Sequence, residues 1–221
     1  MDAGKVNLRK TIDGFHARAG EFREIDVPPT RYLMTDGHGD PNTSPAFTSA
    51  VHVLYPVAFA VKFFSKCELG RDYVVPPLEG LWWASDMAAF TAARDKERWH
   101  WTLMLMVPDW VEADAVATAI ESKRVTVGAE VRQETLTEGR CVQTLHIGSF
   151  DDEAAVLARM HDEVVPQAGL RMVGTHHEIY LSDARRTAPE RMRTIVRQPV
   201  APVAPVIAGD KSPSLHFPVT L

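Results

Sequence analysis

The chain has 221 residues, 45% hydrophobic and 24% charged, with a formal net charge of −5. This composition is typical of a globular protein with one sizeable core or two small fused modules. An acidic chain without a run of Lys or Arg is not expected to bind nucleic acid directly. Its two cysteines, Cys67 and Cys141, show neither a disulfide framework nor metal-ligand spacing.

The N-terminal residues, MDAGKVNLRK, are polar and lack the apolar segment of a secretory signal. The longest apolar stretch, Val51 to Phe64, is interrupted by His52, Pro56 and Lys62, so it is too polar to predict a membrane span. We therefore expect a cytoplasmic protein with no membrane partner. The sequence makes no prediction of the oligomeric state.

In chain order, residues 1–20 predict a short helix or an arm, and a long helix follows the first extended segment. Ser44 suits the N-cap of that helix and Pro45 its first turn, and apolar residues recur at helical spacing as far as Gly70. Pro56 is expected to kink the helix, because the apolar period continues past it. Further helices are predicted at 111–123 and 150–167, and extended segments at 22–38, 72–85, 97–107, 128–136, 139–148, 171–182 and 192–199.

The order strand–helix–strand–strand occurs twice, at about 22–108 and 128–199, which predicts two pseudo-symmetric repeats. Glu79 lies nine positions after Gly70, and Glu178 lies nine positions after Gly169. We expect an α+β domain over residues 1–200, followed by a Pro-rich tail at 201–221. Two such repeats side by side would form one antiparallel sheet, with helices on one face and a ligand cleft on the other. The matched spacing predicts that both glutamates line this cleft.

Two carboxylates in an aromatic cleft favour acid–base work on a water molecule, because desolvation and mutual repulsion favour protonating one of them. They would equally serve as counter-charges for a cationic ligand, although a strand Glu is more often simply exposed. Tyr180 is a candidate donor to a developing oxyanion. No metal or cofactor site is predicted. The candidate catalytic residues are Glu79, Glu178 and Tyr180, and the candidate ligand-binding residues are Trp83, Trp99, Trp101, Tyr32, Met34, Tyr55 and His176.

The segments YLMTDGHGDPNTSPAF, PPLEGLWW, RWHWTLMLMVPDW, HHEIYLSDARR and TIVRQPV, which lie between about Pro28 and Val200, resemble the stand-alone GyrI-like small-molecule-binding proteins. The resemblance implies two fused strand–helix–strand–strand (SHS2-like) modules with a ligand cleft. In relatives that serve as effector domains of multidrug-responsive regulators, a Glu matching Glu178 meets cationic, lipophilic drugs. Those regulators also carry a helix-turn-helix domain, which this sequence does not show.

The resemblance also implies a possible reaction. A subset of stand-alone relatives hydrolyses the cyclopropane of spirocyclopropyl-cyclohexadienone DNA alkylators, with glutamates matching Glu79 and Glu178 activating water and aromatic residues holding the ligand. Our leading hypothesis is therefore a xenobiotic-binding hydrolase. The alternatives are a non-catalytic sensor or sink for cationic lipophilic drugs, a gyrase-modulating interaction protein, and a purely structural domain.

Overall fold

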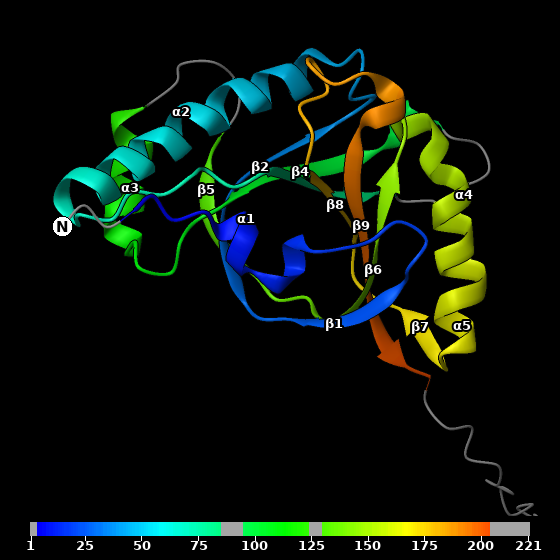
Figure 1. The fold of residues 1–221 in the computed structure, drawn as a ribbon. Helices are drawn as coiled ribbons and strands as arrows, with labels where there is room; N and C mark the ends of the chain where they lie inside the picture. The colour runs from blue at the N-terminus through cyan, green and yellow to red at the C-terminus, as the bar shows by residue number, and fades with distance from the viewer. Residues whose placement is uncertain (1–3, 85–94, 124–129, 204–221) are drawn as a thin grey trace, which may run out of the picture.

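A computed structural model describes residues 4–84, 95–123 and 130–203 (Figure 1). The fold is α+β and is built on a large, wholly antiparallel sheet. The strands are β1 Arg23–Val27, β2 Thr30–His38, β3 Leu78–Trp83, β4 His100–Met106, β5 Arg132–Leu136, β6 Gly139–Ile147, β7 Leu170–Met172, β8 His176–Tyr180 and β9 Arg193–Pro202. The helices are α1 Leu8–Thr11, α2 Pro45–Glu68, α3 Ala113–Ser122, α4 Glu153–Ala158 and α5 Val165–Gln167, with a π-helical turn at Arg159–Val164 between the last two.

The sheet order is β1-β6-β9-β8-β3-β4-β2-β5, and β7 pairs with β9 beside this path. The first half runs β2–α2–β3–β4, in the predicted strand–helix–strand–strand order, and the second runs β6–α4/α5–β7–β8–β9, with β7 as an added strand. Outward from the β3–β8 ladder, β3 is followed by β4 and β2 on one side, and β8 is followed by β9 and β6 on the other. Each strand thus occupies the same place in the sheet as its counterpart in the other half. We call the β3–β8 ladder at the centre the central seam. The outermost strands are exchanged, because β1 pairs with β6 of the second half and β5 pairs with β2 of the first.

Helix α2 begins at Pro45, as the sequence predicts, and continues through Pro56. The hydroxyl of Ser44 does not cap the helix and instead donates to the carbonyl of His38 at 3.4 Å. Among the described helices, α2 is long and apolar enough to cross a membrane by length and composition. Eight of its residues are nevertheless buried, and its apolar side packs against Leu103 and its neighbours, as in the core helix of a globular protein.

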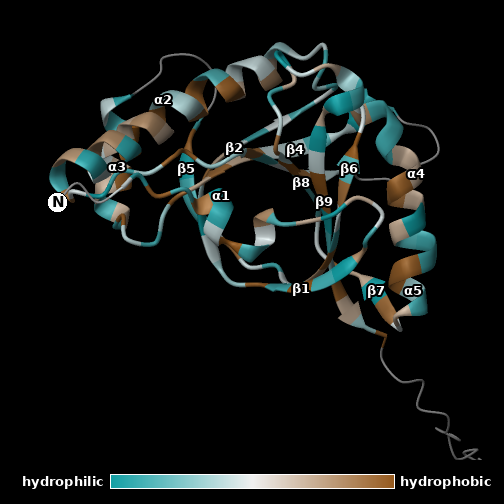
Figure 2. Ribbon diagram, in the orientation of Figure 1, coloured by the Kyte–Doolittle hydropathy of each residue, from teal (hydrophilic) through white to brown (hydrophobic). Residues whose placement is uncertain are grey.

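Both long helical segments pack on the same face of the sheet. Directly paired residues of antiparallel strands share a face, and Leu103, Gly80, Glu178 and Val196 are paired in succession across four strands. Helix α2 packs against Leu103, and the segment from α4 to α5 packs around Val196. We call this side the helix face; Figure 2 shows hydrophobic residues concentrated in the central strands beneath it.

The N-terminal segment covers part of the opposite face. Leu8 of α1 and Phe15 of the following 3₁₀ turn pack against Tyr32, Met104 and Ile195. Figure 1 shows α1 on the side of the sheet away from α2 and α4. We call this side the strap face.

Three predicted boundaries differ in the structure. The segment 72–85 forms a strand only from Leu78, and 171–182 divides into β7 and β8 around Gly174, whose φ of +63° favours glycine. The predicted tail begins too early, because Ala201 and Pro202 belong to β9 and pair with β7. Most of the segment between the predicted strands 72–85 and 97–107, and the rest of the tail, lie outside the described residues.

Candidate functional site

The register of the central seam separates the two predicted carboxylates. Glu178 is paired with Gly80, whereas Glu79 is paired with Ile179. Successive side chains on a strand point to opposite faces, so Glu178 lies on the helix face and Glu79 on the strap face. The prediction that both glutamates line one cleft is wrong, because a one-residue difference in register moves a side chain through the sheet.

Glu178 is held by side chains of its own strand and of β3. The indole Nε1 of Trp82 donates to the hydroxyl of Tyr180 at 3.0 Å. That hydroxyl is hydrogen-bonded to Glu178, and burial together with the Glu178 charge raises the pKa of Tyr180 well above its usual value. On the other side, Nε2 of His176 lies 3.5 Å from Oε1 of Glu178. The carboxylate is thus oriented, yet 12% of its side chain remains exposed.

Gly80 makes room for this arrangement. A Cβ at position 80 would lie 2.8 Å from Nε1 of Trp82 and 3.0 Å from the hydroxyl of Tyr180. Both distances are too short for a side chain without movement of one ring. The glycine directly opposite Glu178 therefore allows the Trp82–Tyr180 hydrogen bond to form across the seam.

Aromatic rings surround this hydrogen-bond chain. Phe47 stacks on Trp82 with centroids 6.2 Å apart, and Trp99 meets the same indole edge-on at 5.9 Å. Phe150 contacts Tyr180 edge-on at 5.7 Å and is 37% exposed. The sequence analysis named neither Phe47 nor Phe150 as a candidate. Trp82 packs against helix α2, on the same face of the sheet as Gly80.

A second acidic residue, Glu153 at the start of α4, lies close enough to Tyr180 for its charge to act on that hydroxyl. Glu153 is buried, and its charge also contributes to the raised pKa of Tyr180. The ring of His161, in the π-helical turn, lies 6.3 Å from that of His176. Burial and the neighbouring His176 lower the pKa of His161 to about 4. Within the described ranges, no group of three or more His, Cys, Asp or Glu is arranged to hold a metal ion.

Glu79 belongs to a buried network on the strap face. Its Oε2 accepts a hydrogen bond from the hydroxyl of Tyr32 at 3.2 Å and lies 3.0 Å from Nε2 of His177. The other ring nitrogen of His177 lies 3.0 Å from Glu138, which also accepts from Arg197 at 2.9 Å. The side chains of Glu79, Glu138, His177 and Arg197 are at most 3% exposed.

This network has balanced charge. Burial alone would lower the pKa of His177, but Glu138 and the hydrogen bonds to both carboxylates raise it. Burial likewise opposes ionisation of Glu138, but His177 and Arg197 lower its pKa to about 2. Two carboxylates therefore face an imidazolium and a guanidinium. These ion pairs stabilise the core, and the Glu79 side chain is only 1% exposed.

The predicted ligand-binding residues are divided between the two faces. Trp101 lies on the helix face, where its ring crosses Gly37, and Tyr55, Trp99 and His176 are on the same side. Tyr32, Met34 and Trp83 lie on the strap face, by their pairing with Met106, Met104 and His100. The two sets do not line one site.

Comparison of the sequence with known protein families identifies one that matches most of the chain. The sequence profile of the GyrI-like small molecule binding domain matches residues 20–201. The chain belongs to the GyrI-like family. No curated protein matches the sequence.

Solved structures of similar proteins agree with the fold. An uncharacterized conserved protein from Listeria innocua is 35% identical, covers 89% of this chain and 100% of its own, and superposes with a TM-score of 0.79. A hydrolase from Listeria innocua has the same identity and coverage, with a TM-score of 0.76. The C-terminal domain of EcmrR, 11% identical over 83% of this chain and 98% of its own, shares the fold at a TM-score of 0.50.

Proposed function

We propose that this GyrI-like protein binds a planar, lipophilic xenobiotic on the helix face and hydrolyses a strained, electrophilic ring in it. The observation that carries the proposal is the setting of Glu178, an oriented and partly exposed carboxylate among aromatic rings at the centre of the sheet. The small-molecule-binding family and the 35% identical hydrolase support it.

The reaction class is addition of water to a spirocyclopropyl-cyclohexadienone. Glu178 takes a proton from water while the water oxygen attacks the cyclopropane methylene. The strained C–C bond breaks, its electron pair moves into the dienone, and the resulting phenolate oxygen takes up a proton. A positioned general base contributes typically ~10²–10⁴-fold to such a step, and Trp82, Tyr180 and Phe150 supply ring faces and edges for a planar ligand.

Two roles differ from the predicted ones. Tyr180 has one hydroxyl proton, and it is directed at Glu178, so we assign Tyr180 to positioning the base instead of an oxyanion. Glu79 is sealed on the strap face, so we assign it to stability. Glu153 replaces it as the second carboxylate near the reacting water.

The test is mass spectrometry of a spirocyclopropyl-cyclohexadienone incubated with the protein. We expect catalytic formation of a product heavier by one water, lost in Glu178→Gln and reduced in Tyr180→Phe. Glu190→Gln, which changes an exposed glutamate, is the matched control and should retain turnover. A wild-type protein that binds the compound and returns it intact would sink the hydrolase proposal in favour of a non-catalytic binding module.

A further inference from the structure

Two histidines lie side by side at one end of the strap face. His38 is the last residue of β2 and His100 is the first of β4, and the register pairs them directly. His100 is also paired with Trp83, which places both imidazoles on the strap face. Both side chains are exposed, so solvent reaches both rings.

The backbone brings these two side chains close together. The N–H of Gly39 donates to the carbonyl of Trp99 at 2.8 Å, which makes these two residues a hydrogen-bonded pair. The next pair, His38 and His100, is therefore of the non-hydrogen-bonded kind, in which side chains approach most closely. The two ring centroids are 6.4 Å apart, with 62° between the ring planes.

This separation suits two imidazoles on one metal ion. An imidazole nitrogen lies about 2.0–2.1 Å from a bound zinc ion, so two rings on the same ion have their centres roughly 5 Å apart. Both side chains are exposed and rotate between staggered conformers, which closes the remaining gap of about 1 Å. Because the sheet fixes both Cα positions, only the side chains need to move.

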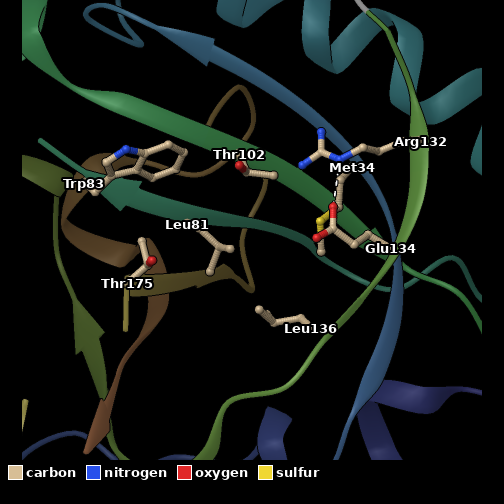
Figure 3. Close-up of a pocket in the computed structure, with 8 residues that line it drawn as sticks. All are labelled: Met34, Leu81, Trp83, Thr102, Arg132, Glu134, Leu136 and Thr175. Atoms are coloured by element: carbon tan, nitrogen blue, oxygen red, sulfur yellow. Dashed lines mark hydrogen bonds and ion pairs between the residues drawn. The ribbon is translucent and has the colours of Figure 1, made fainter. Parts of the chain in front are cut away.

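A tryptophan supports one of the two rings. The indole of Trp83 stacks on the ring of His100, with centroids 5.8 Å apart and 16° between the planes. Trp83 also forms one end of an open pocket of about 350 Å³, which four strands (β2, β3, β4 and β5) and one loop residue line (Figure 3). The histidine pair therefore lies just beyond the rim of this pocket.

The number and type of ligands point to one class of ion. Imidazole nitrogens suit copper, nickel and zinc, whereas calcium and magnesium need oxygen ligands. Asp36, two residues before His38, already accepts from Thr102 and Arg132. No third His, Cys, Asp or Glu in the described ranges completes a larger cluster. Two nitrogen ligands alone favour the ion that binds such ligands most strongly, which is Cu²⁺.

We propose that His38 and His100 form a two-imidazole site for a divalent transition metal ion, Cu²⁺ in preference to Ni²⁺ or Zn²⁺. Water fills the remaining coordination positions, so the ion is exchangeable. A bound ion joins the end of β2 to the start of β4. The proposal does not depend on the proposed hydrolysis, because neither histidine lies on the face of Glu178.

The experiment is titration of the untagged, metal-free protein with Cu²⁺, followed by calorimetry and by electron paramagnetic resonance. We expect one ion per chain, with the hyperfine pattern of two imidazole nitrogens. His38→Gln and His100→Gln should each weaken binding about 100-fold, the lower end of the gain from two linked contacts. The double variant should lose little more, because removal of one ring already abolishes the chelate.

Three controls locate the site. His52→Gln, which removes an exposed histidine of α2, should leave the affinity unchanged. Glu178→Gln should bind Cu²⁺ as the wild type does, which separates this site from the hydrolytic one. The paramagnetic ion beside Trp83 should quench tryptophan fluorescence, and less so in Trp83→Phe. Circular dichroism checks that each variant is folded. Equal affinity in the wild type and in the His38→Gln/His100→Gln double variant, or a spectrum with a single imidazole nitrogen, would overturn the proposal.

Discussion

Replacing Glu79 by Gln should separate stability from catalysis. The Glu79 carboxylate accepts from Tyr32 and contacts a charged His177, with a side chain that is 1% exposed. Hydrogen bonds to charged groups contribute about 1.5–3 kcal/mol each, and solvent does not screen a sealed pair. Gln keeps an acceptor oxygen but loses the charge opposite His177, so we expect a loss of about 2 kcal/mol in the free energy of unfolding.

Urea unfolding at about pH 6 measures that loss, since His177 is charged there. Product formation is then measured at a temperature where both proteins are fully folded. We expect a lower urea midpoint and unchanged turnover for Glu79→Gln, and lost turnover with a smaller midpoint change for Glu178→Gln. Equal loss of turnover in both variants, with the Glu79→Gln midpoint unchanged, would refute the assignment of Glu79 to the buried network.

Three further outcomes are expected. Because the pKa of His177 is raised from 6.5 in the folded state, its contribution is complete below pH 6.5 and is lost as the pH rises through the raised value. The pKa of Glu138 is lowered from 4.5, so its contribution is complete above pH 4.5 and is lost as the pH falls toward about 2. Urea midpoints against pH should therefore fall on both sides of this window, and the alkaline fall should vanish in His177→Gln. Gly37→Ala should cost about 3 kcal/mol or prevent folding, because its Cβ would lie 2.0 Å from the Trp101 ring. Gly80→Ala should lower turnover on the order of tenfold, with a smaller change in stability, because it disturbs the hydrogen bond that positions Glu178.

Each of these outcomes has a control. Gly4→Ala adds a methyl group in open space and should leave the urea midpoint unchanged. A loss below about 1 kcal/mol for Gly37→Ala would contradict the contact with Trp101. An alkaline fall that persists in His177→Gln would assign the pH dependence to another group. Full turnover in Gly80→Ala would show that Glu178 does not depend on the Trp82–Tyr180 hydrogen bond.

The sequence predicted the elements well, because their signals are local. Apolar spacing and Pro45 located α2, and the apolar segment before Pro108 located β4. The sequence also predicted that Glu178 lies in a strand near aromatic residues. It could not predict on which face of the sheet each glutamate lies, because that depends on which residues pair across β3 and β8. Those residues are about a hundred positions apart in the sequence.

The equal spacings from Gly70 to Glu79 and from Gly169 to Glu178 led to the wrong prediction that both glutamates lie on one face, and the reason is physical. After Gly70 the chain passes Tyr73, which bridges to Val6, before β3 begins. After Gly169 it enters β7, which pairs with β9, and then turns at Gly174. Paths of equal length but different shape deliver their strands in registers that differ by one residue, and an odd difference exchanges the faces. Charge partners such as Glu138 and Arg197 are equally invisible without the fold.

The central seam has a mechanical consequence. The β3–β8 ladder lies at the centre of the sheet order and joins the two halves through four paired positions, while the β1–β6 and β2–β5 ladders join them at the outer strands. Side-chain interactions cross this ladder on both faces of the sheet: Glu79 with His177 on the strap face, and Trp82 with Tyr180 on the helix face. The Glu79–His177 pair is buried and charged, whereas the Trp82–Tyr180 contact is a neutral hydrogen bond beside the proposed ligand. A ligand that competes for the Tyr180 hydroxyl would release the contact on the helix face and leave the Glu79–His177 pair and the β3–β8 ladder in place.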